Sequence, residues 1–115
     1  MKKRLSIMAL ALAAAAVQAA PAKPLRTPQA GVLCDSHFCA DARGLSTALT
    51  QKYLGAQAAG ALREQGAFDH QAFTYENGVF CDTRERLCRE NRYFGSDGKR
   101  SAAVEPVFTR LLFPE

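Results

Sequence analysis

The chain has 115 residues, of which 48% are hydrophobic and 23% charged, and this length suits one domain and excludes two. Its formal net charge is +4, from 15 Lys and Arg against 11 Asp and Glu. Three of the cations are Lys2, Lys3 and Arg4, so the rest of the chain has 12 Lys and Arg against 11 Asp and Glu. The resulting net charge of +1 gives no support for nucleic-acid binding.

Residues 1–19 have the features of a secretory signal peptide. A positively charged start is followed by the apolar, alanine-rich run Leu5–Val17, which has the length of a signal core. The small residues around Ala19 and Ala20 predict cleavage between these two. Because the run is too short to span a bilayer, we expect a periplasmic protein with no stable membrane insertion once the signal is removed.

Residues 20–30, with the sequence APAKPLRTPQA, contain three prolines and few apolar side chains. This composition predicts a flexible or extended leader rather than part of a core. Residues 31–115 then form a single domain that contains all the cysteines. A fold of this size is near the limit at which a hydrophobic core alone is sufficient, so covalent cross-links help it.

The phrase GVLCD at residues 31–35 returns as GVFCD at 78–82, and a second cysteine follows each copy. An even number of cysteines in an exported chain predicts two disulfides, with three possible pairings. Four and six residues separate the neighbouring cysteines, and even separations let the sulfurs face each other across antiparallel hairpins. We therefore favour Cys34–Cys39 and Cys81–Cys88. Crossed pairs stay open, since they close longer loops and stabilise more in the chain-entropy model.

Two other cysteine chemistries fit the sequence less well. Zinc prefers shorter ligand spacings than C-x4-C, although His37 lies between Cys34 and Cys39 and would complete such a set. A thiol–disulfide oxidoreductase would use C-x-x-C, which the sequence lacks. The cysteines are therefore predicted to be structural.

The segment from residue 44 to residue 66 has the signals of two short helices. Ser46 is a suitable N-cap, and apolar residues follow it at helical spacing. Gly55 interrupts the pattern, residues 56–65 resume it, and Gly66 is a suitable residue just past the helix end. We expect either two helices that meet at Gly55 or one bent helix, packed closely on a sheet through its alanines.

The following segment is typical of antiparallel strands. Phe73–Tyr75 and Val79–Asp82 flank Asn77-Gly78, a strong hairpin signal. Residues 83–86 are predicted to form a second turn, and residues 87–94 a third strand of the meander.

A turn at residues 95–98 leads toward Pro106, which is predicted to open a short C-terminal helix. The sequence therefore predicts the α+β class: a small disulfide-stapled domain in which antiparallel hairpins or a meander pack against two or three short helices. The repeated phrase is followed each time by a hairpin, a glycine turn and a helix. This order suggests two pseudo-repeated hairpin–helix units.

No catalytic constellation is found in the sequence. It lacks G-x-S-x-G, H-E-x-x-H and a glycine-rich phosphate loop, so we expect no enzyme, no cofactor and no metal. Residues 84–100 hold six cations against three acids. They form either a solvated surface or a candidate binding patch for an acidic protein, an anionic lipid or a polyanion. The six cations are Arg84, Arg86, Arg89, Arg92, Lys99 and Arg100.

Three segments carry a resemblance to a known family. They are GVLCDSHFCAD at residues 31–41, GLSTALTQKYLG at 44–55 and FTYENGVFCDTRERLCRENRYFGSDGKRSAAVEP at 73–106. They resemble the Fels prophage protein-like (YcgJ-like) family of small exported bacterial proteins, and the resemblance extends over residues 31–113. All four cysteines and both G-V-x-C-D phrases fit the family pattern. The resemblance implies export, and it carries over no catalytic residue.

These observations predict a non-catalytic binding or envelope-accessory module with an envelope protein as its partner. The alternative is a small inhibitor of an envelope hydrolase such as lysozyme, which would present a disulfide-locked loop. The candidate loops are residues 35–38 (DSHF) and 83–86 (TRER).

Overall fold

The structure is a computed structural model that describes residues 24–115, and the predicted signal peptide, residues 1–19, lies outside the described part of the chain. Its elements are short and follow one another closely, apart from a long connection before the last helix. In chain order they are β1 (Arg26–Gln29), β2 (Val32–Cys34), β3 (Cys39–Asp41), β4 (Gly44–Ser46), α1 (Thr47–Leu54), α2 (Ala56–Glu64), β5 (Ala72–Thr74), β6 (Phe80–Asp82), β7 (Leu87–Arg89) and α3 (Pro106–Leu112).

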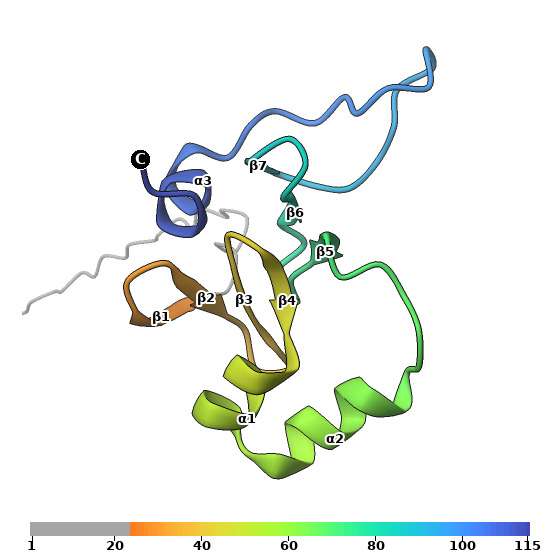
Figure 1. Ribbon diagram of the computed structural model, residues 1–115. Helices are drawn as coiled ribbons and strands as arrows, with labels where there is room; N and C mark the ends of the chain where they lie inside the picture. The colour runs from red at the N-terminus through yellow and green to blue at the C-terminus, as the bar shows by residue number, and fades with distance from the viewer. Residues whose placement is uncertain (1–23) are drawn as a thin grey trace, which may run out of the picture.

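The strands form two antiparallel sheets, and the helices pack around them (Figure 1). The first sheet has the order β1-β2-β3-β4, and the second has the order β5-β6-β7. The sheets meet where the Leu45 N–H of β4 donates to the His70 carbonyl oxygen, 2.9 Å away. A Cβ at Gly44 would lie 2.6 Å from that oxygen, so only glycine allows this approach. The α+β class predicted from the sequence is confirmed.

Each sheet contains a disulfide between directly opposite residues of neighbouring strands. Cys34 is paired with Cys39 across β2 and β3, and Cys81 with Cys88 across β6 and β7. All four side chains are at most 1% exposed. These are the local pairs that the even separations favoured. Each bridge fixes the register of a hairpin whose strands have only three residues each.

The repeated G-V-x-C-D phrase encodes a turn, a strand and a cap in the same order. Gly31 and Gly78 have φ angles of +81° and +93°, a region that glycine enters at little cost. The cysteine then forms the disulfide, and the aspartate caps the next turn. Asp35 Oδ1 accepts the N–H of His37, and Asp82 Oδ1 accepts the N–H of Arg84. The phrase therefore recurs because each unit needs the same local structure.

The second cysteine of each pair binds a helix through the same contact. Cys39 donates its backbone N–H to Thr50 Oγ1 of α1 at 2.9 Å, and Cys88 donates to Thr109 Oγ1 of α3 at 2.8 Å. Both threonines occupy the fourth position of their helix. This shared geometry supports two pseudo-repeated units, in which strands, a disulfide hairpin and a helix follow one another.

The helix boundaries agree with the capping residues. Ser46 Oγ accepts the N–H of Leu49 at 3.0 Å, as predicted for the N-cap of α1. Glu105 has the same role for α3, with Pro106 in the first turn. Gly55 separates α1 from α2, so the prediction of two helices that meet at this glycine is confirmed.

The two units share one apolar core. The Phe38 ring of the first unit stacks on the Tyr75 ring of the second, with 4.9 Å between centroids. The Tyr75 hydroxyl donates to the Leu33 carbonyl oxygen at 2.8 Å. Burial raises the pKa of Tyr75 well above its ordinary value, and the charge of Asp35 adds to the effect, so this hydroxyl stays a donor. The core residues are Leu33, Phe38, Ala40, Leu45, Leu62, Phe73, Tyr75, Val79, Cys81, Cys88, Leu112 and Phe113.

Two segments differ from the sequence prediction. Residues 26–29, assigned to a flexible leader over 20–30, form the edge strand β1. All four are exposed, so they leave no apolar pattern in the sequence. The third strand, predicted over residues 87–94, ends at Arg89. From there residues 90–104, here called the arm, leave the sheet as a long hairpin that projects from the body of the molecule before α3 (Figure 1).

Replacement of the two helix threonines by valine tests the shared contact. Thr50→Val leaves the buried Cys39 N–H without its acceptor, and we expect the free energy of unfolding to fall by about 1–3 kcal/mol. Thr109→Val should have the same direction and a smaller effect, because this side chain is only partly buried. The exposed Thr27→Val is the matched control, with an expected change of about 0.5 kcal/mol or less. Urea unfolding followed by circular dichroism measures all three, and equal losses at Thr27 and Thr50 would contradict the role of the hydroxyl.

Candidate functional site

One buried carboxylate determines the conformation of loop 35–38, the turn between Cys34 and Cys39. Asp35 is 3% exposed. Its Oδ1 accepts the N–H groups of His37 and Phe38, at 2.7 and 2.9 Å. Its Oδ2 accepts the N–H of Glu76 from the second unit at 2.7 Å. Because a buried carboxylate needs such donors, these three bonds fix both the shape of the loop and its place on the second unit.

The fixed loop turns the Phe38 side chain into the core and the preceding His37 side chain outward. Phe38 packs on Phe73 and Tyr75, whereas the His37 side chain is 74% exposed. His37 Nε2 lies 3.5 Å from Glu76 Oε1. The same carboxylate of Glu76 accepts the hydroxyl and the N–H of Ser36. The loop therefore presents the His37 imidazole beside a carboxylate, and the hydroxyl and N–H of Ser36 hold that carboxylate in place.

A groove of about 550 Å³ lies between loop 35–38 and helix α2. A second hollow of about 360 Å³ continues it toward β5, and the two share residues of the loop and of α2. The polar groups of the groove are hydroxyl, imidazole and amide groups, which bind peptide groups well. The residues that line the groove are Ser36, His37, Phe38, Leu54, Gln57, Ala58, Ala61, Leu62 and Gln65.

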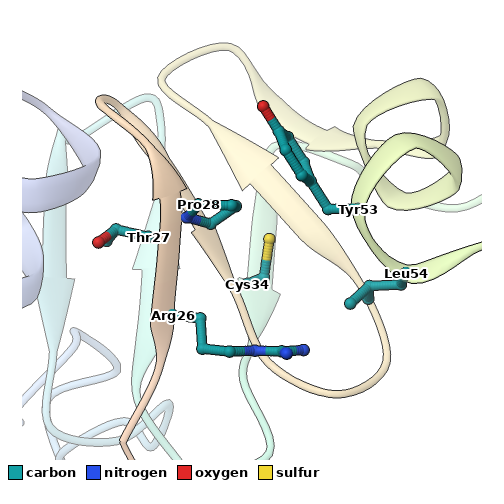
Figure 2. A pocket seen from close by; sticks show the side chains of 6 residues that line it. All are labelled: Arg26, Thr27, Pro28, Cys34, Tyr53 and Leu54. Carbon is teal, nitrogen blue, oxygen red and sulfur yellow. The ribbon is translucent and has the colours of Figure 1, made fainter.

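A smaller pocket of about 240 Å³ lies between β1 and α1, and Figure 2 shows its lining side chains. The Cys34 sulfur, Pro28 and Leu54 give it apolar walls, and the Arg26 guanidinium closes one end. The Tyr53 hydroxyl donates to an oxygen of the Gln29 side chain. This pocket is smaller than most ligand sites, which occupy about 300–1,000 Å³.

The structure divides the predicted basic patch between two places. Arg84 and Arg89 lie at the β6–β7 hairpin and are engaged by acids. Both terminal nitrogens of Arg84 contact the Asp69 carboxylate, at 3.0 and 3.2 Å. Arg89 pairs with Glu85 at 3.2 Å. Arg86, in loop 83–86 of the same hairpin, lies 5.1 Å from the centroid of the Phe113 ring. Because acids engage two of these three cations, the hairpin does not form a continuous basic surface.

The other three cations, Arg92, Lys99 and Arg100, lie on the arm. The Arg100 guanidinium lies 4.1 Å from the Phe80 ring centroid and 4.0 Å from that of Phe94. Sequence reasoning missed the aromatic part of this surface, in which Tyr93 and Phe94 are 62% and 60% exposed. The signal that could have revealed it is a pair of adjacent aromatic residues directly after an arginine.

The zinc alternative at Cys34, His37 and Cys39 is wrong, because the two sulfurs are bonded to each other and offer no thiolate. Over residues 24–115, no group of three His, Cys, Asp or Glu side chains is placed to hold a metal ion. In the same part of the chain, no helix has both the length and the apolar character needed to cross a membrane.

Comparison with known proteins agrees with the resemblance found in the sequence. Residues 25–113 match the family model described as YcgJ protein. The chain is 48% identical over 89 residues to a protein of Escherichia coli (strain K12) that bears the name "Uncharacterized protein YcgJ". That match covers 77% of this chain and 73% of the Escherichia coli protein. No solved structure gives a significant match.

Replacement of Asp35 and Asp82, the aspartates of the two G-V-x-C-D copies, by alanine tests whether they contribute unequally to stability. Asp35→Ala removes three charge-assisted hydrogen bonds from a buried site, and we expect it to lower the free energy of unfolding by about 3 kcal/mol or more. Asp82→Ala removes one backbone bond and one exposed ion pair, so about 1 kcal/mol is expected. Urea unfolding of both variants measures the difference, and equal losses would contradict the bridging role of Asp35.

The Arg84–Asp69 pair predicts a pH dependence. The hydrogen bond from Arg84 is the main cause that lowers the pKa of Asp69 below 3.8, and the N–H of Gln71 adds to it. A carboxyl whose pKa is lower in the folded state stabilises the fold above pH 3.8, and this contribution is lost as the pH falls through the folded pKa. Arg84→Gln should raise the Asp69 pKa toward 3.8, measured by NMR titration of the carboxyl carbon. Arg43 is exposed and pairs with Asp41 instead, so Arg43→Gln should leave the Asp69 pKa unchanged, and an equal shift in both variants would contradict the assignment.

Proposed function

The chain belongs to the YcgJ family, and we propose that it is an exported, non-catalytic binding module that recognises an envelope protein. The proposed contact surface is loop 35–38 together with the groove beside α2. Two disulfides support export, because such bonds persist in oxidising compartments. The predicted signal peptide, residues 1–19, supports the periplasm as the site of action.

The observation that carries the proposal is the rigidity of loop 35–38. A disulfide closes it, the Asp35 carboxylate binds its backbone, and Phe38 anchors it in the core. A partner that binds a loop already held in one conformation loses little conformational entropy. The outward His37 and the adjoining groove then offer a polar tip beside an apolar hollow, an arrangement common in protein interfaces.

The same geometry supports binding rather than catalysis. The four cysteines are oxidised, so none of them can act as a nucleophile. The Glu76 carboxylate, 3.5 Å from the His37 imidazole, is already held by the backbone and hydroxyl of Ser36. The groove is lined by apolar side chains, two glutamine amides, the Ser36 hydroxyl and the His37 imidazole, groups that can recognise a peptide by hydrogen bonds and apolar contact.

A second candidate function shares this loop. A projecting, disulfide-closed loop also suits an inhibitor that fills the active-site cleft of an envelope hydrolase such as lysozyme. The exposed imidazole of His37 would then enter the cleft, where it could pair with a catalytic carboxylate. The two candidates differ in the partner, and they can be separated by experiment.

Photo-crosslinking in the host tests the proposed surface. A photoreactive phenylalanine at position 37 and another at position 61 should crosslink to the same protein, because both residues line the groove. With that protein purified, we expect His37→Ala and Ala61→Glu each to weaken binding by about tenfold or more. Ala48→Glu places the same charge on α1 outside the groove and is the matched control, with unchanged affinity expected.

Crosslinking to different proteins from the two positions, or equal loss of affinity in the Ala48 control, would contradict the proposal. A lysozyme turbidity assay separates the second candidate. Slowed clearing by the wild-type chain and normal clearing with His37→Ala would assign the loop to hydrolase inhibition instead.

A further inference from the structure

The arm exposes two neighbouring aromatic side chains that the loop and groove do not use. Tyr93 and Phe94 are 62% and 60% exposed, far more than the aromatic residues of the core. Exposure of large apolar side chains is costly, and clusters of them mark interaction sites. The backbone of the arm projects away from the sheets in Figure 1.

The position of the arm is fixed by contacts along its length. The Glu90 N–H donates to the Ala103 carbonyl oxygen at its base, at 2.9 Å. Near its tip, the Gly95 N–H donates to the Lys99 carbonyl oxygen at 2.7 Å. Between them, the Arg100 guanidinium is stacked against the ring of Phe80, which is 5% exposed and belongs to β6. The arm is therefore attached to the second sheet, and its rings are held in the solvent.

Each exposed ring has a guanidinium beside it. Arg92 lies 5.6 Å from the Tyr93 centroid, and Arg100 lies 4.0 Å from the Phe94 centroid. Lys99 adds a third cation, and the acids of the arm are Glu90 at its base and Asp97 near its tip. The arm therefore places apolar rings and positively charged side chains next to each other on one hairpin.

The two rings have different neighbours within the protein. Phe94 packs on Arg100, whereas Tyr93 lines a hollow of about 260 Å³ that is bordered by Tyr75 and Glu76. Each ring still keeps more than half of its surface exposed beside a cation. The interface of an anionic bilayer accepts aromatic rings at the level of its headgroups, while its phosphates meet the neighbouring cations.

We propose that the arm docks on an anionic lipid surface, with Tyr93 and Phe94 at the boundary between headgroups and acyl chains and with Arg92 and Lys99 at the lipid phosphates. Aromatic side chains favour this depth, and cations near an anionic leaflet are attracted to it. The docking is peripheral, in keeping with the lack of a spanning helix in residues 24–115. The docking residues are not those of loop 35–38 or of the groove beside α2, so the proposal can be tested without the proposed protein partner.

Vesicle co-sedimentation of the full chain, as recovered from its host, tests the proposal. The vesicles contain phosphatidylcholine alone or phosphatidylcholine mixed with phosphatidylglycerol. We expect the wild-type chain to partition about tenfold or more in favour of the anionic vesicles, and this preference to decrease with salt. The double variants Tyr93→Ser/Phe94→Ser and Arg92→Gln/Lys99→Gln should each lose about tenfold in partition.

Two remote variants are the matched controls. Phe68→Ser removes an exposed ring outside the arm, and Arg43→Gln removes a cation whose side chain is 92% exposed. Both should partition like the wild-type chain. All variants share the same N-terminal residues, so any affinity of that segment for lipid is equal in every sample and cancels in the comparison.

A fluorescence measurement makes the test independent of the double variants and of their folding. The chain contains no tryptophan, so Tyr93→Trp gives an indole emission from that position alone. We expect a blue shift on anionic vesicles and quenching by lipids brominated in their acyl chains, and neither effect for Phe68→Trp. An emission of the Tyr93→Trp variant that stays unshifted, or arm variants that partition like the wild-type chain, would overturn the proposal. Capture of an acidic protein through the arm without vesicle binding would overturn it in favour of a protein partner.

Discussion

The Asp35 carboxylate is the interaction on which the arrangement of the two units depends. It accepts two N–H groups from its own loop and one from Glu76 in the second unit. By fixing the loop it places Phe38 on Tyr75, and the Tyr75 hydroxyl in turn binds the backbone of β2. Without the carboxylate, three N–H groups next to the core would have no acceptor. The shared core and the exposed position of His37 therefore follow from one side chain.

The second unit repeats the plan of the first with one large change. In the first unit a turn of two residues joins β3 to β4, and α1 begins directly after β4. In the second unit the arm, residues 90–104, occupies the place of that turn and strand before α3. The threonine contact and the helix N-cap are nevertheless present in both units. The repeated framework tolerates a long projection because the disulfide and the helix cap hold the base of each unit without it.

The sequence predicted features that depend on neighbours along the chain. Ser46, Gly55 and Asn77-Gly78 act within a few residues of themselves, and the helices and the hairpin appear where these signals lie. The features that it missed depend on distant partners. Edge strand β1 is exposed and contains Pro28, so only its pairing with β2 reveals it. The basic patch looked continuous because Asp69, the partner of Arg84, lies 15 positions earlier in the chain.

An exposed aromatic ring and a loop held in one conformation both cost free energy, and contacts with the scaffold hold each of them in place. A free loop would let an aromatic ring fold back onto apolar surface, since burial of apolar area is favourable by about 25 cal/mol per Å². On the arm, Arg100 restrains Phe94 because its guanidinium stacks on Phe80 and Phe94 at once. Loop 35–38 has the equivalent restraint in a disulfide and a buried carboxylate. Because each surface is tied to a rigid hairpin at its base, each can present its side chains to a partner with little further loss of entropy.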